Sequence, residues 1–177
     1  LNFVWFEAPM PDYDFSNYKK LTDKIGIKII PSGNWIMDLH RFYEAIDQKI
    51  WSATRTDMAM MGGITFCKDA ITMSENANMD CEIMSWGYTL VSVANLHLML
   101  STKNCTYYEQ PLPYDQFEYG MKDVLRTDSN GFMNAPTKPG LGTDINWDKM
   151  NKKIIYSYFC ENDKKIKDFQ NFKTLVT

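Results

Sequence analysis

Apolar and polar residues follow two different periods along the first 110 positions. Short runs rich in apolar and β-branched residues predict five strands, at residues 3–6, 27–31, 51–55, 80–83 and 106–108. Between these runs, apolar residues recur every three or four positions, which is the pattern of an amphipathic helix. This pattern predicts four helices, of which the first ends at Gly26 and the others cover residues 37–49, 64–77 and 90–100.

The spacing of the predicted strands restricts the architecture to two folds. Successive strands begin about 25 residues apart, which leaves room for one crossover helix and so favours parallel pairing. Such a series forms either an open doubly wound sheet or a (β/α) barrel. The doubly wound sheet usually carries a GxGxxG or P-loop motif, and the chain contains neither. The barrel is therefore favoured, although a complete one needs about 200 to 250 residues and five units form only part of it.

The pattern changes after Pro111. Loops rich in proline and glycine follow, notably at residues 136–142, and the polar tail contains one candidate strand at residues 154–159. We therefore divide the chain into a partial barrel domain at residues 1–110 and a region of loops and tail at residues 111–177. We expect the second region to pack on the barrel or on a capping domain.

The composition limits the partners of this chain. With 177 residues and a hydrophobic fraction of 45%, it can bury the core of one domain. Its 19 Lys and Arg against 22 Asp and Glu give a net charge of -3 without a long basic run, which argues against nucleic acid as a partner. The longest uncharged stretch, residues 83–102, is interrupted by polar residues, so we expect no membrane span. Four widely spaced cysteines are typical of reduced thiols in the cytoplasm.

Chemistry in such a barrel is found where the strands end, so the residues at these positions are the candidates for a site. They are Glu7, Asn34, Asp57, Met84 and Glu109. Three carboxylates at three strand ends could bind a divalent cation or transfer protons, because hard cations prefer oxygen ligands. Each acid taken alone is as simply explained as a helix cap or a loop residue. The shared position of all three favours a site.

Several short motifs stand in an order that resembles the enolase superfamily. They are Trp5-Phe6-Glu7-Ala8-Pro9, Pro31-Ser32-Gly33-Asn34-Trp35, Asp57 with Met61-Gly62-Gly63-Ile64-Thr65, Met84-Ser85-Trp86-Gly87, Ala94-Asn95-Leu96-His97-Leu98 and Pro139-Gly140-Leu141-Gly142. The similarity covers about residues 2–150 and is strongest to the branch of mandelate racemase and the acid-sugar dehydratases. It implies that this α/β chain is the C-terminal portion of a TIM-like (β/α) barrel, about strands 4 to 8. Missing N-terminal strands, or a partner chain, would supply the rest.

The resemblance implies a magnesium-dependent reaction on a small-molecule carboxylic acid or acid sugar. In that family, carboxylates at the ends of strands three, four and five bind Mg2+, and the enzyme abstracts the proton next to the substrate carboxylate. Glu7 matches the fourth-strand ligand. The fifth-strand ligand usually follows a glycine, and here that position is held by Asn34, whose neutral amide is a weaker ligand of magnesium.

The candidate catalytic residues are Asp57, Glu109 and Arg55, of which the resemblance implies Asp57 and Glu109. Asp57 matches the aspartate that pairs with a histidine in the general-base dyad, but Met84, which carries no proton, occupies the histidine position. Arg55 lies two residues before Asp57 on the same face of the strand, so we expect the two side chains to form an ion pair. Glu109 matches the acid that hydrogen-bonds the substrate carboxylate.

Trp35, Trp86 and Met84 stand at strand ends, where they are candidates to line a substrate pocket. The two tryptophans could equally fill the rim of the barrel. Two functions therefore stand beside each other. One is a cytoplasmic, homo-oligomeric lyase or racemase that depends on Mg2+. The other, suggested by Asn34 and Met84, is a catalytically impaired relative or fragment that binds an acid sugar or a protein.

Overall fold

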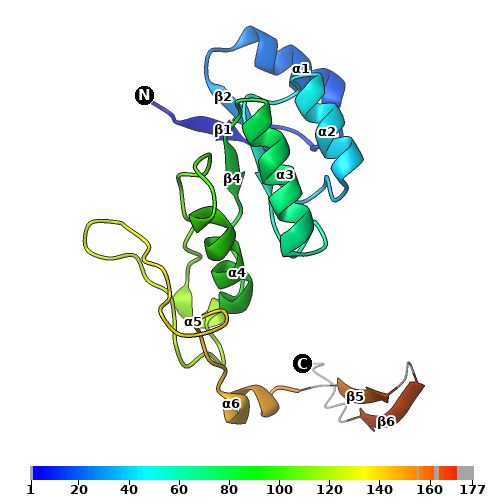
Figure 1. The fold of residues 1–177 in the computed structure, drawn as a ribbon, viewed down its shortest axis with the longest axis vertical. Coiled ribbons are helices and arrows are strands. Elements are labelled where there is room, and N and C mark those ends of the chain that lie inside the picture. The colour runs from blue at the N-terminus through cyan, green and yellow to red at the C-terminus, as the bar shows by residue number, and fades with distance from the viewer. Residues whose placement is uncertain (1, 155, 162–163, 171–177) are drawn as a thin grey trace, which may run out of the picture.

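The computed structural model describes residues 2–154, 156–161 and 164–170 (Figure 1). Its regular elements are, in chain order, β1 (Trp5–Glu7), α1 (Phe15–Lys24), β2 (Lys28–Ile30), α2 (Leu39–Asp47), β3 (Thr54–Thr56), α3 (Ile64–Asn76), β4 (Cys81–Ile83), α4 (Thr89–Leu100), α5 (Tyr114–Phe117), α6 (Trp147–Asn151), β5 (Tyr156–Glu161) and β6 (Lys164–Gln170). As far as α4, strand and helix alternate as the hydrophobic pattern predicts.

The first four strands form two parallel pairs. β1 pairs with β2, and β3 pairs with β4. Hydrogen bonds connect the two pairs, because the backbone N–H groups of Ser52 and Ala53 donate to the carbonyl of Ile29, at 2.9 and 3.4 Å. The strands thus follow one another in chain order, as successive strands of a (β/α) barrel do.

The fifth strand predicted at residues 106–108 does not form. Residues 103–110 run beside β4 as an irregular segment. The carboxylate of Glu82, in β4, accepts hydrogen bonds from the backbone N–H groups of Thr106 and Tyr107, at 3.3 and 3.2 Å. A side chain therefore takes the acceptor role that a strand carbonyl would have, and no regular ladder forms.

Aspartates set the beginning of the first two helices. The side chain of Asp14 accepts a hydrogen bond from the backbone N–H of Asn17 at 3.2 Å, and that of Asp38 accepts one from Arg41 at 2.8 Å. Both are N-cap residues, which satisfy N–H groups that have no partner within the helix. For this reason α2 begins at Leu39, later than the pattern predicts.

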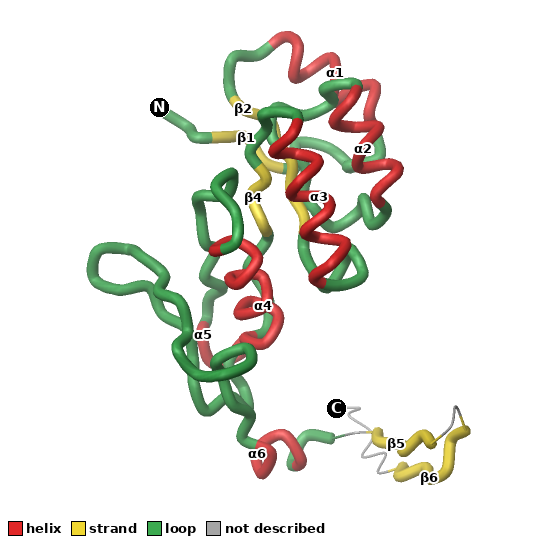
Figure 2. Tube along the Cα trace, viewed as in Figure 1, coloured by secondary structure: helices red, strands yellow, loops and turns green. Residues whose placement is uncertain are grey.

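The core lies between the strands and helices α1 to α4. Trp51, which is 2% exposed, makes edge-on contacts with Phe15, Tyr18 and Phe42, at centroid distances of 5.9, 6.3 and 6.4 Å. Figure 2 shows α2 and α3 side by side on one side of β1 and β2. Such aromatic contacts fix the helices against the strands and leave the strand ends available for a site.

Residues after position 110 form long loops and the two short helices α5 and α6, and of these α5 and part of the loops lie along α4 (Figure 1). The hydroxyl of Thr89 donates to the carbonyl of Phe117 at 3.2 Å, and Nε2 of His97 lies 3.1 Å from the carbonyl oxygen of Leu141. Farther on, β5 and β6 pair as an antiparallel hairpin. β5 covers residues 156–159 of the strand predicted at residues 154–159, whereas Ile154 precedes the strand and residue 155 lies outside the described residues.

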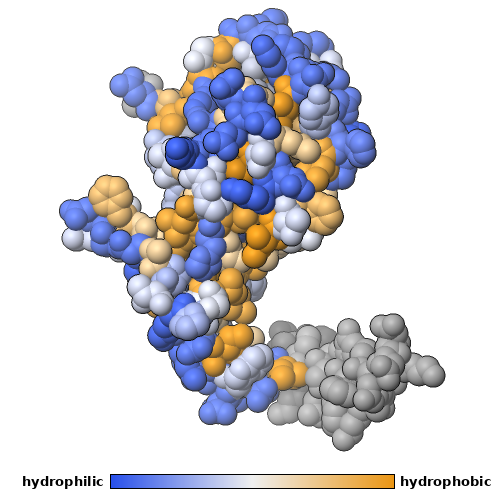
Figure 3. Space-filling view, viewed as in Figure 1, coloured by the Kyte–Doolittle hydropathy of each residue, from blue (hydrophilic) through white to orange (hydrophobic). Residues whose placement is uncertain are grey.

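The outer edge of β1 is apolar and open. Within the described part of the chain, β1 pairs only with β2, so its other edge carries unpaired backbone groups. Phe3, Val4 and Phe6 are 67, 54 and 49% exposed. Figure 3 shows apolar residues reaching the surface beside polar ones. Among the described residues, no helix is long and apolar enough to cross a membrane.

Candidate functional site

Two of the predicted acids, Glu7 and Glu109, form ion pairs with the guanidinium of Arg55. The side chain of Arg55, in β3, is only 3% exposed. Its Nη1 donates to Oε2 of Glu7, at the end of β1, at 3.0 Å, and its Nη2 donates to Oε1 of Glu109. We refer to Arg55, Glu7 and Glu109 as the Arg55 cluster. It places a buried cation between two partly exposed carboxylates.

The expected ion pair between Arg55 and Asp57 is not formed. Oδ1 of Asp57 instead accepts hydrogen bonds from Nδ2 of Asn95 at 2.8 Å and from the backbone N–H of Ala59 at 3.0 Å. Asp57 lies just beyond β3, which ends at Thr56. The alternation of side chains along a strand therefore no longer applies to Asp57, and its carboxylate turns to α4.

Asn95 forms hydrogen bonds with Asp57, after β3, and with Met84, after β4, the two positions at which the resemblance implies a general-base dyad. Besides Asp57, its Nδ2 binds the carbonyl of Met84 at 2.7 Å, and its Oδ1 accepts the backbone N–H of Met58 at 3.0 Å. Asn95 is fully buried. Asp57 is thus fixed as a hydrogen-bond acceptor, and Met84 brings no titratable group to it.

Ser85 fixes the backbone of Glu109. The backbone N–H of Glu109 donates to Oγ of Ser85 at 2.6 Å, and this hydroxyl donates to the carbonyl of Glu109 at 3.0 Å. A hydroxyl can donate and accept at once, so one buried serine replaces a step of backbone pairing. This arrangement holds Glu109 where its carboxylate reaches Arg55.

The loop after β2 covers the stem of Arg55. Gly33 is buried with a φ of +79°, and a Cβ at this position would lie 2.8 Å from Cγ of Arg55. The buried carboxylate of Asp12 holds the loop by accepting the N–H and hydroxyl of Ser32, at 2.8 and 2.7 Å, and the N–H of Gly33, at 3.2 Å. Asn34 lies in the same loop and is partly buried.

The two predicted pocket tryptophans lie at the surface. Trp35 is 64% exposed. Trp86 is 52% exposed, and its ring packs edge-on against Phe117 with centroids 5.0 Å apart. Trp86 therefore contacts α5. Substrate binding by Trp35, Trp86 and Met84 stays a prediction.

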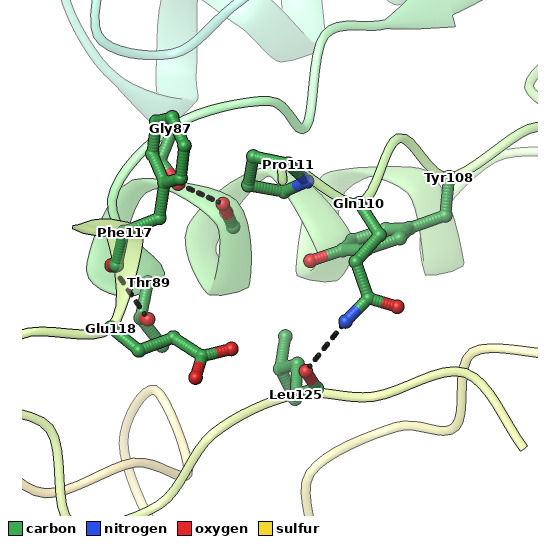
Figure 4. A pocket seen from close by; sticks show the side chains of 9 residues that line it. Gly87, Thr89, Tyr108, Gln110, Pro111, Phe117, Glu118 and Leu125 are labelled. Atoms are coloured by element: carbon green, nitrogen blue, oxygen red, sulfur yellow. Dashed lines mark hydrogen bonds between the residues drawn. The ribbon is translucent and has the colours of Figure 1, made fainter. Parts of the chain in front are cut away.

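A small pocket lies between α4 and the later loops (Figure 4). It is lined by Gly87, Thr89, Ser92, Tyr108, Gln110, Pro111, Phe117, Glu118 and Leu125. The space inside it that a water molecule can occupy is about 20 Å³, far below the range of about 300 to 1,000 Å³ that is usual for ligand sites. Figure 4 shows Tyr108 and Glu118 directed into it, and burial raises the pKa of the Tyr108 hydroxyl. The predicted site residues lie outside this lining, so the pocket is separate from the Arg55 cluster.

The residues of the Arg55 cluster do not fit a magnesium ion. Oε2 of Glu7 already accepts hydrogen bonds from Arg55 and from Nε1 of Trp5, at 3.0 and 3.3 Å. Asn34 offers only a neutral amide. Within residues 2–154, 156–161 and 164–170, no group of three or more His, Cys, Asp or Glu side chains could hold a metal ion.

Two residues that organise this site carry only a weak signal in the sequence. Asp12 stands in a short loop, where an acid is ordinary. Asn95 is one polar residue in a mostly apolar helix, and such a position is a signal for a buried hydrogen-bond network. Neither residue stands at a strand end. Asp12 lies in the loop before α1 and Asn95 lies in α4, and each reaches a strand-end loop from there.

Parallel strands with helical crossovers and acids at the strand ends define part of a (β/α) barrel of the enolase type. The family model described as Enolase C-terminal domain-like matches residues 1–149, so the chain belongs to this family. Within it, the chain is the C-terminal portion of the barrel and belongs to the mandelate racemase branch of the enolase superfamily.

Solved structures agree with this assignment. A protein from Pseudovibrio sp., assigned to the mandelate racemase/muconate lactonizing enzymes, is 37% identical with a TM-score of 0.83, over 85% of this chain and 40% of that one. D-glucarate dehydratase from Agrobacterium tumefaciens, solved in complex with magnesium, is 30% identical with a TM-score of 0.76 over the same shares. The 3,6-anhydro-D-galactonate cycloisomerase from Zobellia galactanivorans shares the fold at 24% identity, with a TM-score of 0.77 over 85% of this chain and 42% of that one. The chain spans about 40% of the length of these relatives.

Proposed function

We propose that this chain is part of a barrel that binds a small hydroxylated carboxylic acid or acid sugar, and that its own residues no longer carry out proton abstraction. D-glucarate, which appears in the name of the dehydratase that is 30% identical, is an acid of this class. Glu109 is the residue that the resemblance places on the substrate carboxylate. The relatives therefore support the class of ligand, and the residues of this chain support the loss of proton abstraction.

One observation carries the proposal, namely the environment of Asp57. A general base needs a group that accepts and releases a proton within hydrogen-bond reach of the substrate. The carboxylate of Asp57 is buried and bound by Asn95, and the position of its implied histidine partner is held by Met84. Neither Asn95 nor Met84 can take up a proton at neutral pH, so the dyad is inactive.

The net charge of the site predicts how strongly an anionic ligand binds and how its affinity depends on salt. Glu7, Glu109 and Asp57 bring three negative charges and Arg55 one positive charge, so we expect weak binding of an anionic acid by the 177-residue chain. Salt screens such repulsion, because the Debye length falls from about 30 Å at 0.01 M to about 10 Å at 0.1 M ionic strength. Acid binding at this site should therefore strengthen with added salt, whereas adventitious binding to exposed lysines should weaken.

The competing function is an active racemase or dehydratase. The retention of Glu7, Asp57 and Glu109 at the strand ends favours it. In this case the chain, or a longer polypeptide that contains it, would exchange the proton next to the carboxylate of its substrate with solvent.

Two measurements on the 177-residue chain decide between these functions. D-glucarate and mandelate are titrated calorimetrically at 10 and 150 mM NaCl, and loss of the α-proton signal is followed by NMR in D2O. We expect weak binding of at least one acid, stronger at the higher salt, and no loss of the α-proton signal. The Glu109→Gln variant removes one negative charge and should bind the acid more tightly. Lys28→Met serves as the control, because Lys28 is the first residue of β2 and so lies at the opposite end of that strand from the site.

Each alternative outcome is decisive. Loss of the α-proton signal faster than in buffer, with or without MgCl2, would establish the enzyme and reject the impaired site. Binding that weakens with salt, or that does not respond to Glu109→Gln, would place the acid elsewhere and reject the ligand assignment.

A further inference from the structure

We propose that the guanidinium of Arg55 is the resident cation of the strand-end site, and that it takes the place of a divalent metal ion between Glu7 and Glu109. The Arg55 cluster is the reason for this inference. One charged group, almost completely withdrawn from water, reaches a carboxylate on each side. A site that already holds a positive charge in this position has no need of a second one.

The geometry uses the properties that distinguish arginine from lysine. Its two Nη atoms diverge from a planar fork, so one side chain can donate to two separate carboxylates. Nη1 reaches Oε2 of Glu7 and Nη2 reaches Oε1 of Glu109. A lysine offers a single charged nitrogen and could not be placed equally well against both acids.

The surrounding residues are arranged around the side chain of Arg55. Gly33 lies against its aliphatic stem, where a Cβ would be only 2.8 Å from Cγ and 3.2 Å from Cδ. On the side of Glu7, Trp5 donates its Nε1 to the same oxygen that Arg55 binds, and its ring packs edge-on against Tyr107 at 5.0 Å. The cluster is therefore enclosed by residues of β1, of the loop after β2 and of the segment after α4.

Occupancy by Arg55 explains why the remaining donors do not suit a metal. A metal ion would have to compete with a guanidinium that is tethered to β3 and always charged. The nearest candidate ligand on the next strand end, Asn34, adds no negative charge that would favour the metal. Among the described residues, Nε of Arg55 has no hydrogen-bond partner, so the guanidinium also keeps one free donor inside the site.

This inference goes beyond the proposed function, because it concerns the cation and not the acid. It can be tested without any acid present. If the chain binds no carboxylic acid, the inference about Arg55 is unaffected, and the reverse is equally true.

The first test compares metal affinity in the wild-type 177-residue chain and two variants. MgCl2 is titrated calorimetrically into the wild type, Arg55→Met and Lys28→Met. Arg55→Met preserves much of the volume and leaves Glu7 and Glu109 without their counter-ion. We expect Mg2+ to bind this variant at least tenfold more tightly than the wild type. Lys28→Met removes a cation that is paired with Asp80, outside the cluster, and should leave Mg2+ affinity unchanged.

A second measurement needs no variant and decides the question if Arg55→Met does not fold. The side-chain N–H signals of Arg55 are followed by NMR in the wild type while MnCl2, a paramagnetic substitute for magnesium, is added. We expect these signals to persist at equimolar Mn2+, because no metal enters the cluster. Selective broadening of the Arg55 signals, or wild-type Mg2+ affinity equal to that of Arg55→Met, would overturn the proposal.

Discussion

Gly33 and Arg55 are in such close contact that a Cβ on Gly33 would lie 2.8 Å from Cγ of Arg55. The φ of Gly33 is +79°, a conformation that L-residues with a side chain adopt only at a cost. The position therefore requires glycine for two independent reasons. One is the backbone conformation, and the other is the space taken by the arginine stem.

We predict that Gly33→Ala lowers the free energy of unfolding by about 1 to 3 kcal/mol, since it combines backbone strain with a steric clash. Urea denaturation measures the change. Gly26→Ala is the matched control, because Gly26 is exposed and has nothing within 4 Å of the added Cβ. Equal effects of the two substitutions would contradict the contact between Gly33 and Arg55.

Much of the fold could be predicted from the sequence because strand and helix periods are local properties. The observed α3, Ile64–Asn76, differs from the predicted helix only at its last residue. The order and parallel direction of the first four strands follow from the spacing between them. The segment at 106–108 could not be predicted correctly, since the acceptor that interrupts its pairing, Glu82, belongs to another strand.

The residues that form the site could be predicted from the sequence, but their hydrogen-bond partners could not. Glu7, Arg55 and Glu109 are recognisable from their places at strand ends and in the motifs. Which carboxylates Arg55 binds depends on where β3 ends and on the polar residue that α4 presents to Asp57. Both are results of tertiary packing. The sequence pattern near Arg55 therefore suggests a local partner, and the structure provides two distant ones.

We predict that Asn95→Leu destabilises the fold by about 2 to 4 kcal/mol, because three groups that are buried or partly buried each lose one hydrogen bond at once. These are the carboxylate of Asp57, the N–H of Met58 and the carbonyl of Met84. Asn76→Leu, an exposed substitution at the end of α3, is the control. Thermal denaturation measures both, and a loss below about 0.5 kcal/mol for Asn95→Leu would contradict the network.

Asp12→Ala should release the loop that carries Gly33 and Asn34. The carboxylate of Asp12 accepts hydrogen bonds from two backbone N–H groups and from the hydroxyl of Ser32, each worth about 1.5 to 3 kcal/mol when the acceptor is charged. We expect the amide hydrogens of Ser32 and Gly33 to exchange at least tenfold faster in the variant.

The control for this prediction is Asp23→Ala, which removes an exposed carboxylate that is paired with Lys19 on the same helix. Exposed pairs of this kind contribute little to stability. Amide exchange at Ser32 and Gly33 should therefore be unchanged in this control. If Asp12→Ala leaves the same two amides protected, Asp12 does not hold the loop.

The buried thiols make the stability of this chain sensitive to alkaline pH. Burial raises the pKa of Cys67 to about 11 and those of Cys81 and Cys105 to about 12. In the unfolded chain a thiol ionises near pH 8.5. Between these values the unfolded state releases protons that the folded state retains, so the free energy of unfolding falls as the pH rises. Below about pH 7.5 these thiols are almost entirely protonated in both states and contribute little pH dependence.

We predict that the free energy of unfolding decreases from pH 9 upward, by at most about 1.4 kcal/mol per pH unit for each fully ionised thiol of the unfolded chain. Urea denaturation at intervals between pH 7 and 10.5 measures the slope. Lysines and tyrosines also titrate in this range, so the comparison is made between the wild type and Cys81→Ala, in which only one thiol is lost. The variant should show a shallower decline above pH 9 and the same pH dependence as the wild type between pH 7 and 7.5. Parallel curves over the whole range would mean that Cys81 ionises as readily in the folded chain as in the unfolded one, which would contradict its burial in β4 beside Thr54 and Ser74.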